Sequence, residues 1–260
     1  QQYALNLLKV HKAGSAVLID INNGNILCMA STPSYNPNKI IQKPNKEYWD
    51  TILNNELSPL TYRCIQGLYA PGSTFKMVVA IAGIANGIID TNTKHFCSGK
   101  VNLGDRLYHC WKNNGHGSMN VSDAIKESCD VFFYEISKKI GIDKIARVAE
   151  DFGLGKIYDV HLPNQKKGII PSRDWKKKIY DESWYPGETL ISAIGQGFVL
   201  TNPLQLAVMT SIIASNGKNV KPNIIKQNND IEFEKLEKYQ NAIKIIKSSM
   251  FKVVNETKGT

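Results

Sequence analysis

A serine and a lysine three positions apart, Ser73 and Lys76, stand at the start of an apolar stretch, in the run 71–76 (PGSTFK). In a helix, residues three apart lie on one face, so the lysine amine can approach the serine hydroxyl. A free serine hydroxyl is a poor nucleophile at neutral pH and needs such a base. Backbone N–H groups at the same helix end can stabilise an oxyanion. The pair therefore predicts acyl chemistry on Ser73.

The S-x-x-K pattern is weak by itself, because it recurs at Ser215/Lys218 and at Ser249/Lys252. Only the first match has Pro-Gly ahead of it and a long apolar helical pattern behind it. Taken alone, the tetrapeptide favours a serine that merely caps a core helix over a nucleophile.

A second group of residues able to do chemistry is Cys97, Cys110, His116 and Cys129. Three thiolates and one imidazole suit a tetrahedral zinc ion, which in a closed four-coordinate site would orient its loop. The alternatives are a Cys97–Cys110 disulfide and unrelated buried thiols. We favour zinc, since a disulfide explains neither His116 nor Cys129. No organic cofactor is expected.

The composition is that of an ordinary globular chain, with 260 residues, 42% apolar and 21% charged. It excludes a disordered tail, a collagen-like repeat and a small disulfide knot. The net charge of +9 is compatible with anionic partners, but solvated lysine-rich faces such as 166–167 and 176–178 are the favoured explanation. No Gly-rich phosphate loop or basic run with interleaved aromatics occurs, so no nucleic-acid partner is expected.

No membrane span is expected within the chain, because no run approaches about eighteen apolar residues. The chain begins with Gln1 rather than Met and has no visible signal peptide, so we expect it to be a fragment.

The elements that must position these groups begin with two apolar runs in 14–31, which flank Asn-Asn-Gly-Asn at 22–25 and predict a β-hairpin. Residues 32–59 indicate a loop with a short helix. A buried helix is expected from near Ser73 to Gly87, and 91–120 is expected to be irregular.

Further helices are expected at 121–140, with Ser122 as N-cap and Gly141 as the stop, and at 142–151, 202–215 and 234–254. Residues 153–188 are expected to be rich in loops. Strands first and helices afterwards favour an α/β architecture with a helical lobe, in which only two strands are evident.

The run 69–76 (YAPGSTFK) resembles the active-site serine motif of the penicillin-binding proteins, the peptidoglycan transpeptidases. Ser128-Cys129-Asp130 resembles the second motif of that family, in the form S-x-D, and 14–38 resembles its opening hairpin. Other stretches that resemble family landmarks, in the family's order, are 184–189 (WYPGET), 194–197 (IGQG) and 201–205 (TNPLQ). The resemblance covers nearly the whole chain and is greatest to the class B enzymes of cell elongation.

The resemblance implies the serine β-lactamase/penicillin-binding transpeptidase-like fold, an antiparallel sheet with packed helices and a helical lobe. Ser73 would attack a D-alanyl-D-alanine stem peptide, with Lys76 as base. Ser128 would relay protons to the leaving amine, and Asp130 would position substrate or the lysine. Transfer to an amine on a neighbouring stem peptide would complete the cross-link, and β-lactams would acylate Ser73.

The same resemblance implies a structural zinc near the cleft and a domain that fills residues 1–260. A membrane anchor and a pedestal domain would lie upstream, with the catalytic domain on the periplasmic side of a bacterial inner membrane. The implied partners are stem peptides, lipid-linked precursor, β-lactam antibiotics and a membrane glycosyltransferase of the elongation machinery.

One departure concerns the family's third motif, K-[ST]-G, which occurs nowhere in the sequence. The end of the chain, 257–260 (TKGT), is similar only superficially, because its context resembles the stretch before that strand. We expect the domain to be incomplete at its C-terminal end and inactive alone. A non-catalytic β-lactam-sensing domain and a β-lactamase-type hydrolase are the alternatives. The stretches 14–38 and 184–205 weigh against the hydrolase.

Overall fold

The computed structural model describes residues 1–41 and 45–260. In chain order, the first elements are α1 (Gln2–Leu8), β1 (Gly14–Ile19), β2 (Ile26–Thr32), α2 (Pro37–Ile41), α3 (Lys46–Leu53), α4 (Arg63–Gln66), the 3₁₀ turn η1 (Gly72–Phe75) and α5 (Lys76–Ala85). They are followed by β3 (His95–Cys97), β4 (Lys100–Leu103), β5 (Arg106–His109), β6 (Gly117–Met119), α6 (Val121–Lys126), α7 (Asp130–Ile140) and α8 (Ile142–Asp151). The last are α9 (Arg173–Tyr180), α10 (Pro186–Ala193), α11 (Pro203–Ala214), η2 (Glu237–Tyr239) and α12 (Gln240–Asn255).

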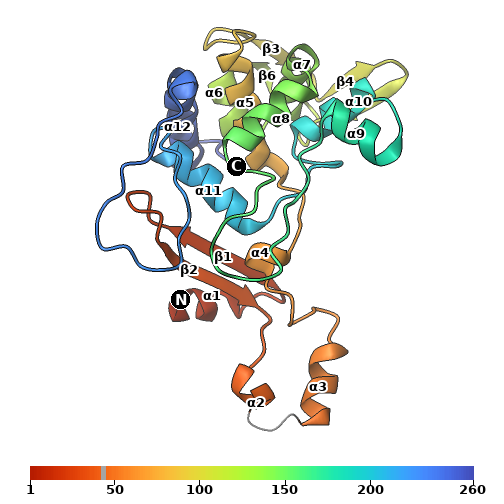
Figure 1. The fold of residues 1–260 in the computed structure, drawn as a ribbon. Coiled ribbons are helices and arrows are strands. Elements are labelled where there is room, and N and C mark those ends of the chain that lie inside the picture. The colour runs from red at the N-terminus through yellow and green to blue at the C-terminus, as the bar shows by residue number, and fades with distance from the viewer. Residues whose placement is uncertain (42–44) are drawn as a thin grey trace.

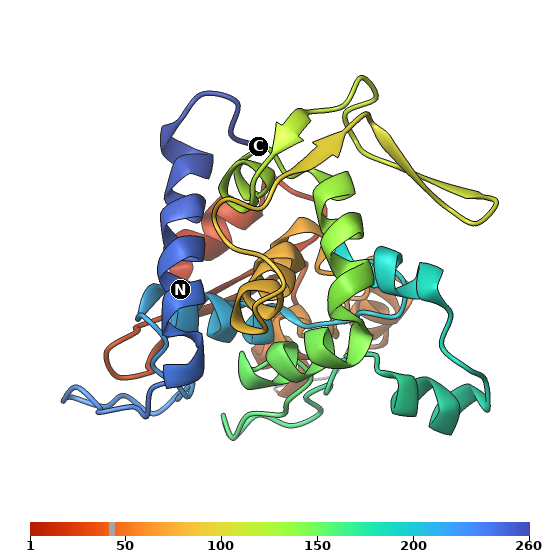
Figure 2. The same cartoon turned by 90° about the horizontal axis from the view of Figure 1, so that it is seen from above.

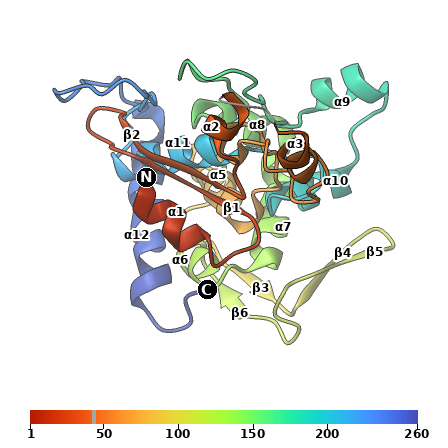
Figure 3. The ribbon, with the colours of Figure 1, turned by 90° about the horizontal axis from the view of Figure 1, so that it is seen from below.

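The predicted hairpin is confirmed, since β1 and β2 pair antiparallel from Gly14↔Thr32 to Ile19↔Ile26. Its turn contains Gly24, whose φ of +77° is a conformation that side chains with a Cβ rarely adopt. Figure 1 shows α11 above the hairpin and α1 below it, and Figure 3 shows α1 in front of the strands from below. The hairpin is thus covered on both faces by helices.

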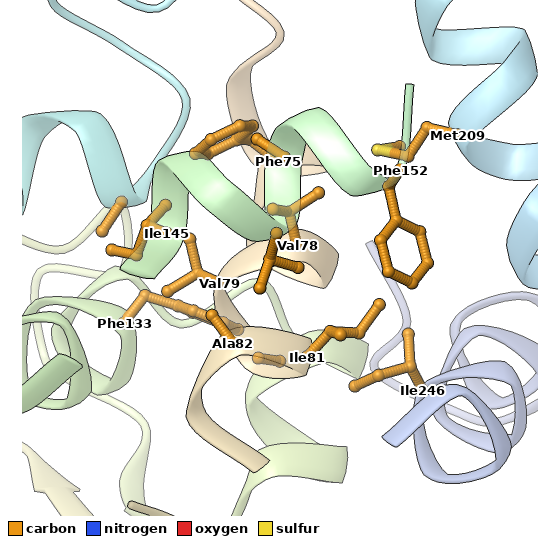
Figure 4. Packing of buried hydrophobic residues seen from close by; sticks show 14 of the residues in the cluster. Phe75, Val78, Val79, Ile81, Ala82, Phe133, Ile145, Phe152, Met209 and Ile246 are labelled. Carbon is orange, nitrogen blue, oxygen red and sulfur yellow. The ribbon is translucent and has the colours of Figure 1, made fainter. Parts of the chain in front are cut away.

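Helix α5 forms the centre of the helical part of the molecule. Five consecutive residues, Val78 to Ala82, are completely buried. Side chains from α7, α8, α11 and α12 surround them, among them Phe133, Ile145, Met209 and Ile246 (Figure 4). A helix that is apolar all round must be enclosed by other elements, and Figure 2 shows α5 ringed by helices. Burial therefore fixes the helix that follows Ser73.

The segment 95–119, which we name the Cys/His lobe, is more regular than expected. It contains the antiparallel pairs β3–β6 and β4–β5, so the expectation of only two strands is wrong. These strands have three or four residues each, too few for an alternating pattern to emerge from the sequence. The α/β fold class is confirmed by the overall match described below.

Several helical boundaries also differ from expectation. The segment 32–59 holds two helices, α2 and α3, and the supposedly loop-rich 153–188 contains α9 and the start of α10. The N-cap of α6 is Asn120 and not Ser122, because the Asn120 side chain accepts a hydrogen bond from the Asp123 N–H at 2.9 Å. The helices α8 and α11 are confirmed close to their predicted ranges, whereas α12 begins at Gln240 instead of 234 and follows the 3₁₀ turn η2.

The expected helix at 121–140 is in fact two helices, α6 and α7. They are separated by a turn at Ser128, whose φ is +50°. The break places Ser128 outside both helices, where its side chain can face Ser73. Across the described ranges, no helix combines the length and the apolar character needed to cross a membrane.

Candidate active site

Ser73 lies in the 3₁₀ turn η1, directly before α5. Its side chain is exposed, whereas Phe75, two positions on, is 1% exposed and anchors the turn in the core. The Thr74 hydroxyl donates to the Pro71 carbonyl at 2.8 Å. The predicted helix start is therefore confirmed in place but is 3₁₀ rather than α in its first turn. The serine hydroxyl is therefore exposed at the surface, while Phe75 anchors the turn that carries it in the core.

The loop of Gly195, Gln196 and Gly197 packs against the serine turn. The Gly72 N–H donates to the Gly195 carbonyl at 3.0 Å. A Cβ at position 195 would stand 2.2 Å from the Gly72 carbonyl oxygen, and φ there is +70°, so this close approach requires glycine. The stretch 194–197 (IGQG) thus forms one side of the site, although its first residue is 121 positions after Ser73.

Lys76, Ser128 and Asp130 form a continuous set of contacts with Ser73. The Ser128 hydroxyl donates to Ser73 Oγ at 2.9 Å. Lys76 Nζ donates to Ser128 Oγ at 3.0 Å, to the Ser128 carbonyl at 2.9 Å and to Asp130 Oδ1 at 2.6 Å. All four residues selected from the sequence for catalysis are therefore brought together in one place.

The connection between Ser73 and Lys76 differs from the expected one. Among the hydrogen bonds of the described residues, none joins the two side chains directly, and Ser128 stands between them. Lys76 is only 2% exposed, and its amine is held by Asp130 and by the Ser128 carbonyl. Spacing along a helix predicts a shared face, but the long-range partners of the amine decide where it points.

The turn that carries Ser128 is held by Trp111, a residue that the sequence reasoning missed. The Trp111 indole N–H donates to the Glu127 and Ser128 carbonyls at 3.1 and 3.0 Å. Its backbone N–H donates to Asp130 Oδ2 at 2.9 Å. The position of Trp111 next to Cys110 was the sole signal in the sequence.

Cys97, Cys110, His116 and Cys129 converge from separate elements of the Cys/His lobe and the start of α7. Their ligand atoms all lie within 4.8 Å of one another. His116 Nδ1 lies 3.5 Å from the sulfur atoms of both Cys97 and Cys110. All five cysteines of the chain, each within the described ranges, are free thiols. The cluster can hold a metal ion, and three sulfurs with one imidazole nitrogen fit a tetrahedral one.

The contact between the Cys110 and Cys129 sulfurs polarises this cluster. The hydrogen bond from Cys129 lowers the pKa of the Cys110 thiol, and the same bond, together with burial, raises the pKa of Cys129. A thiolate rather than a thiol is the metal ligand, so the lowered pKa of Cys110 favours metal binding.

The other two S-x-x-K matches have plain structural roles. Ser215 and Ser249 are buried, and their hydroxyls donate to carbonyls of the helices that contain or precede them, at Ile212 and Ile245. Only the match at Ser73 combines an exposed hydroxyl with a buried lysine in a polar network.

Residues 14–260 match the family model of the penicillin binding protein transpeptidase domain. The peptidoglycan D,D-transpeptidase MrdA of Haemophilus influenzae is 34% identical, with 100% of this chain and 42% of that protein aligned. The MrdA of Acinetobacter baumannii is 37% identical, with 83% of this chain and 32% of that protein aligned. The chain thus spans less than half the length of these curated relatives.

Solved structures agree with the sequence relatives. The penicillin-binding protein PBP2 from Helicobacter pylori has a TM-score of 0.94 and 33% identity, and the match covers 100% of this chain and 49% of that one. A complex between that PBP2 and MreC matches with a TM-score of 0.91 and 32% identity, over 99% and 48% of the two chains. A peptidoglycan synthase complex described as coordinating polymerization and crosslinking matches with a TM-score of 0.81 and 32% identity, over 92% and 42%.

Proposed function

This chain belongs to the penicillin-binding protein transpeptidase family, and from that premise we propose that it carries the catalytic serine of a peptidoglycan D,D-transpeptidase of the elongation type. The observation that carries the proposal is the unbroken series of contacts Ser73–Ser128–Lys76–Asp130 behind an exposed serine hydroxyl. The similarity to MrdA proteins and to PBP2 structures supports the elongation type.

In the proposed first step, Ser73 Oγ attacks the carbonyl of the penultimate D-alanine of a stem peptide. The C–O bond forms and the C–N bond to the terminal D-alanine breaks. The Ser73 proton leaves through Ser128 to the free amine of Lys76, along the contacts of 2.9 and 3.0 Å. The proton then passes from Lys76 through Ser128 to the nitrogen of the departing D-alanine and completes its amine.

In the second step, an amine on a neighbouring stem peptide attacks the acyl-enzyme carbonyl. The new C–N bond is the cross-link, Ser73 is released, and the proton of the attacking amine returns to Ser73 through the same groups. Asp130 contacts Lys76 and not Ser73, which supports a role in positioning the lysine. Backbone N–H groups of the turn that carries Ser73 are the proposed oxyanion hole.

Zinc is the proposed occupant of the four-residue cluster. Cys97, Cys110, His116 and Cys129 would hold it, and when bound it would act as a structural cross-link of the Cys/His lobe to the residue between Ser128 and Asp130. The lowered pKa of Cys110 supports metal binding. Mass spectrometry of the undenatured protein is expected to find one zinc ion, and an apo protein with a Cys97–Cys110 bridge would overturn this.

The proposed setting of the chain is the periplasmic side of a bacterial inner membrane, as the transpeptidase domain of a longer protein. Residues 1–260 would form one domain. Its proposed substrates are stem peptides and lipid-linked precursor, and its proposed inhibitors are β-lactams. The PBP2–MreC complex and the peptidoglycan synthase complex support partners in the elongation machinery, including a membrane glycosyltransferase.

The test is labelling of the full-length protein with a fluorescent penicillin, followed by mass spectrometry of the labelled peptide. We expect one stable adduct on Ser73, none in Ser73→Ala, and full labelling in the matched control Ser249→Ala, which alters another S-x-x-K serine. Incubation with donor and acceptor stem peptides is expected to release one D-alanine per cross-link. An unlabelled Ser73 would overturn the proposal, and an adduct that turns over rapidly to hydrolysed antibiotic would overturn it in favour of a β-lactamase-type hydrolase.

A further inference from the structure

We propose that Trp111 is a positioning residue, whose indole N–H holds Ser128 in the conformation that brings its hydroxyl to Ser73. This inference rests on the proposed function, because the purpose of that conformation is proton transfer between Ser73 and Lys76.

Trp111 holds the catalytic turn at three points. Its indole N–H donates to the carbonyls of Glu127 and Ser128, at 3.1 and 3.0 Å, and its backbone N–H donates to Asp130 at 2.9 Å. The first two contacts come from the side chain, whereas the third survives any substitution that keeps the backbone in place. The side-chain and main-chain contributions are thus separable by experiment.

The turn needs such a partner because Ser128 is in the left-handed region, with φ of +50°. For a residue with a Cβ this conformation is strained, so surrounding contacts must maintain it. The Ser128 carbonyl accepts from both Lys76 Nζ, at 2.9 Å, and the Trp111 indole. If the turn relaxed to negative φ, the Ser128 side chain would leave its place between Ser73 and Lys76.

The indole is itself held from the Cys/His lobe. Its ring meets the His116 ring edge to face, with centroids 5.4 Å apart and an interplanar angle of 68°. It also follows Cys110 directly in sequence. The Trp111 side chain therefore joins the four-residue Cys/His cluster to the turn that carries Ser128. Because Trp111 is 57% exposed, its loss removes few core contacts, and its role in the turn can be tested in a folded protein.

The test compares wild type with two substitutions in the full-length protein. Trp111→Phe keeps an aromatic ring without the N–H, and replacement of the Trp111 indole by the isosteric benzothiophene removes the N–H alone. The matched control is Trp184→Phe, which removes another indole hydrogen bond, the one from Trp184 to the Thr189 hydroxyl at 2.8 Å. The measurements are the rate constant for acylation at saturating penicillin, the final labelled fraction, the zinc content, and amide hydrogen exchange at residues 128 and 129.

We expect both Trp111 variants to acylate about tenfold more slowly, a barrier increase of about 1.4 kcal/mol. They should reach the labelled fraction and zinc content of wild type, with faster amide exchange at 128 and 129. The Trp184 variant should match wild type in rate. A purely structural role would instead lower the labelled fraction or the zinc content at an unchanged rate constant, and would overturn the inference.

Two further outcomes separate this inference from the proposed function. Wild-type rates in both Trp111 variants, with Ser73 labelled throughout, would overturn the role of Trp111 and leave the transpeptidase intact. Absence of acylation in wild type itself would overturn both.

Discussion

The two serines of the site are held by different forces. Ser73 lies in η1, directly before α5, whose side chains from Val78 to Ala82 are completely buried among helices. Ser128 stands on a turn between α6 and α7, held by hydrogen bonds from Lys76 and Trp111 and joined to the Cys/His lobe through Cys129. That lobe has strands of three or four residues and exposes Phe96 and Trp111.

The two kinds of contact should therefore affect different quantities, the free energy of unfolding and the rate of acylation. Apolar burial is non-directional and contributes most of the folding free energy, so the position of Ser73 depends on the integrity of the whole core. Hydrogen bonds and metal ligands are directional and local, so the position of Ser128 depends on a few contacts. We therefore expect changes around α5 to unfold the protein, and changes around Ser128 to slow a protein that remains folded.

Lys76 joins the two regions, and its loss should have the largest effect. In Lys76→Met the acylation rate constant should fall by about a thousandfold, since the proposed base for Ser73 is lost. Removal of the lysine also leaves Asp130, 9% exposed, without its partner at 2.6 Å, so the melting temperature should fall as well. Penicillin acylation kinetics and thermal unfolding measure both.

The matched control for this variant is Lys247→Met, because Lys247 is an exposed lysine that donates to Asn216 and Ala214 far from the cluster of catalytic residues. It should acylate as wild type does. Rapid acylation of Lys76→Met would remove Lys76 from the proposed mechanism.

Ile81→Ala tests the core side of the comparison. Ile81 is completely buried in α5, and the substitution should lower the free energy of unfolding by about 3 kcal/mol through a lost contact area and a cavity. The acylation rate constant of the folded fraction should not change. Denaturant unfolding with parallel acylation kinetics measures the two quantities.

The control is Ile179→Ala. Because Ile179 is 58% exposed, this substitution should change the free energy of unfolding by less than about 0.5 kcal/mol. If Ile81→Ala acylated more slowly while its free energy of unfolding stayed unchanged, the division between the two regions would be contradicted.

Cys97→Ser tests the contacts that hold the Ser128 turn. Of the three variants it should lose the least free energy of unfolding. Loss of bound zinc should remove about 2.7 kcal/mol if the ion is present at a hundred times its dissociation constant. The acylation rate constant should nevertheless fall, because the Cys129 side of the turn loses an anchor. Zinc content, unfolding and acylation are measured together, with a chelator on wild type as a second route to the same state.

Cys28→Ala serves as the control, because Cys28 is also buried but lies in β2, outside the four residues proposed to bind zinc. It should keep its zinc and its rate. A zinc-free Cys97 variant that acylates at the wild-type rate would show that the cluster does not support the catalytic turn.

Much of the site was accessible from the sequence because its signals are local. The Asn-Asn-Gly-Asn turn predicted the hairpin, and the apolar run after Ser73 predicted α5. The four residues of the Cys/His cluster were chosen from their ligand chemistry and from the family resemblance, and the structure gathers all four. Short strands in the Cys/His lobe and the break at Ser128 were missed, since neither has a periodic pattern long enough to detect.

The order of residues along the chain supplies the reactive groups: a serine and lysine at a helix start, a Ser-x-Asp motif, and three thiols with an imidazole. How these groups connect depends on the packing of the folded chain. It placed Ser128 between Ser73 and Lys76, separated from them by 55 and 52 positions, and it brought Trp111 onto the turn. Local propensity acts over a few residues, whereas contacts at such separations exist only after the core has packed and fixed the elements that carry them.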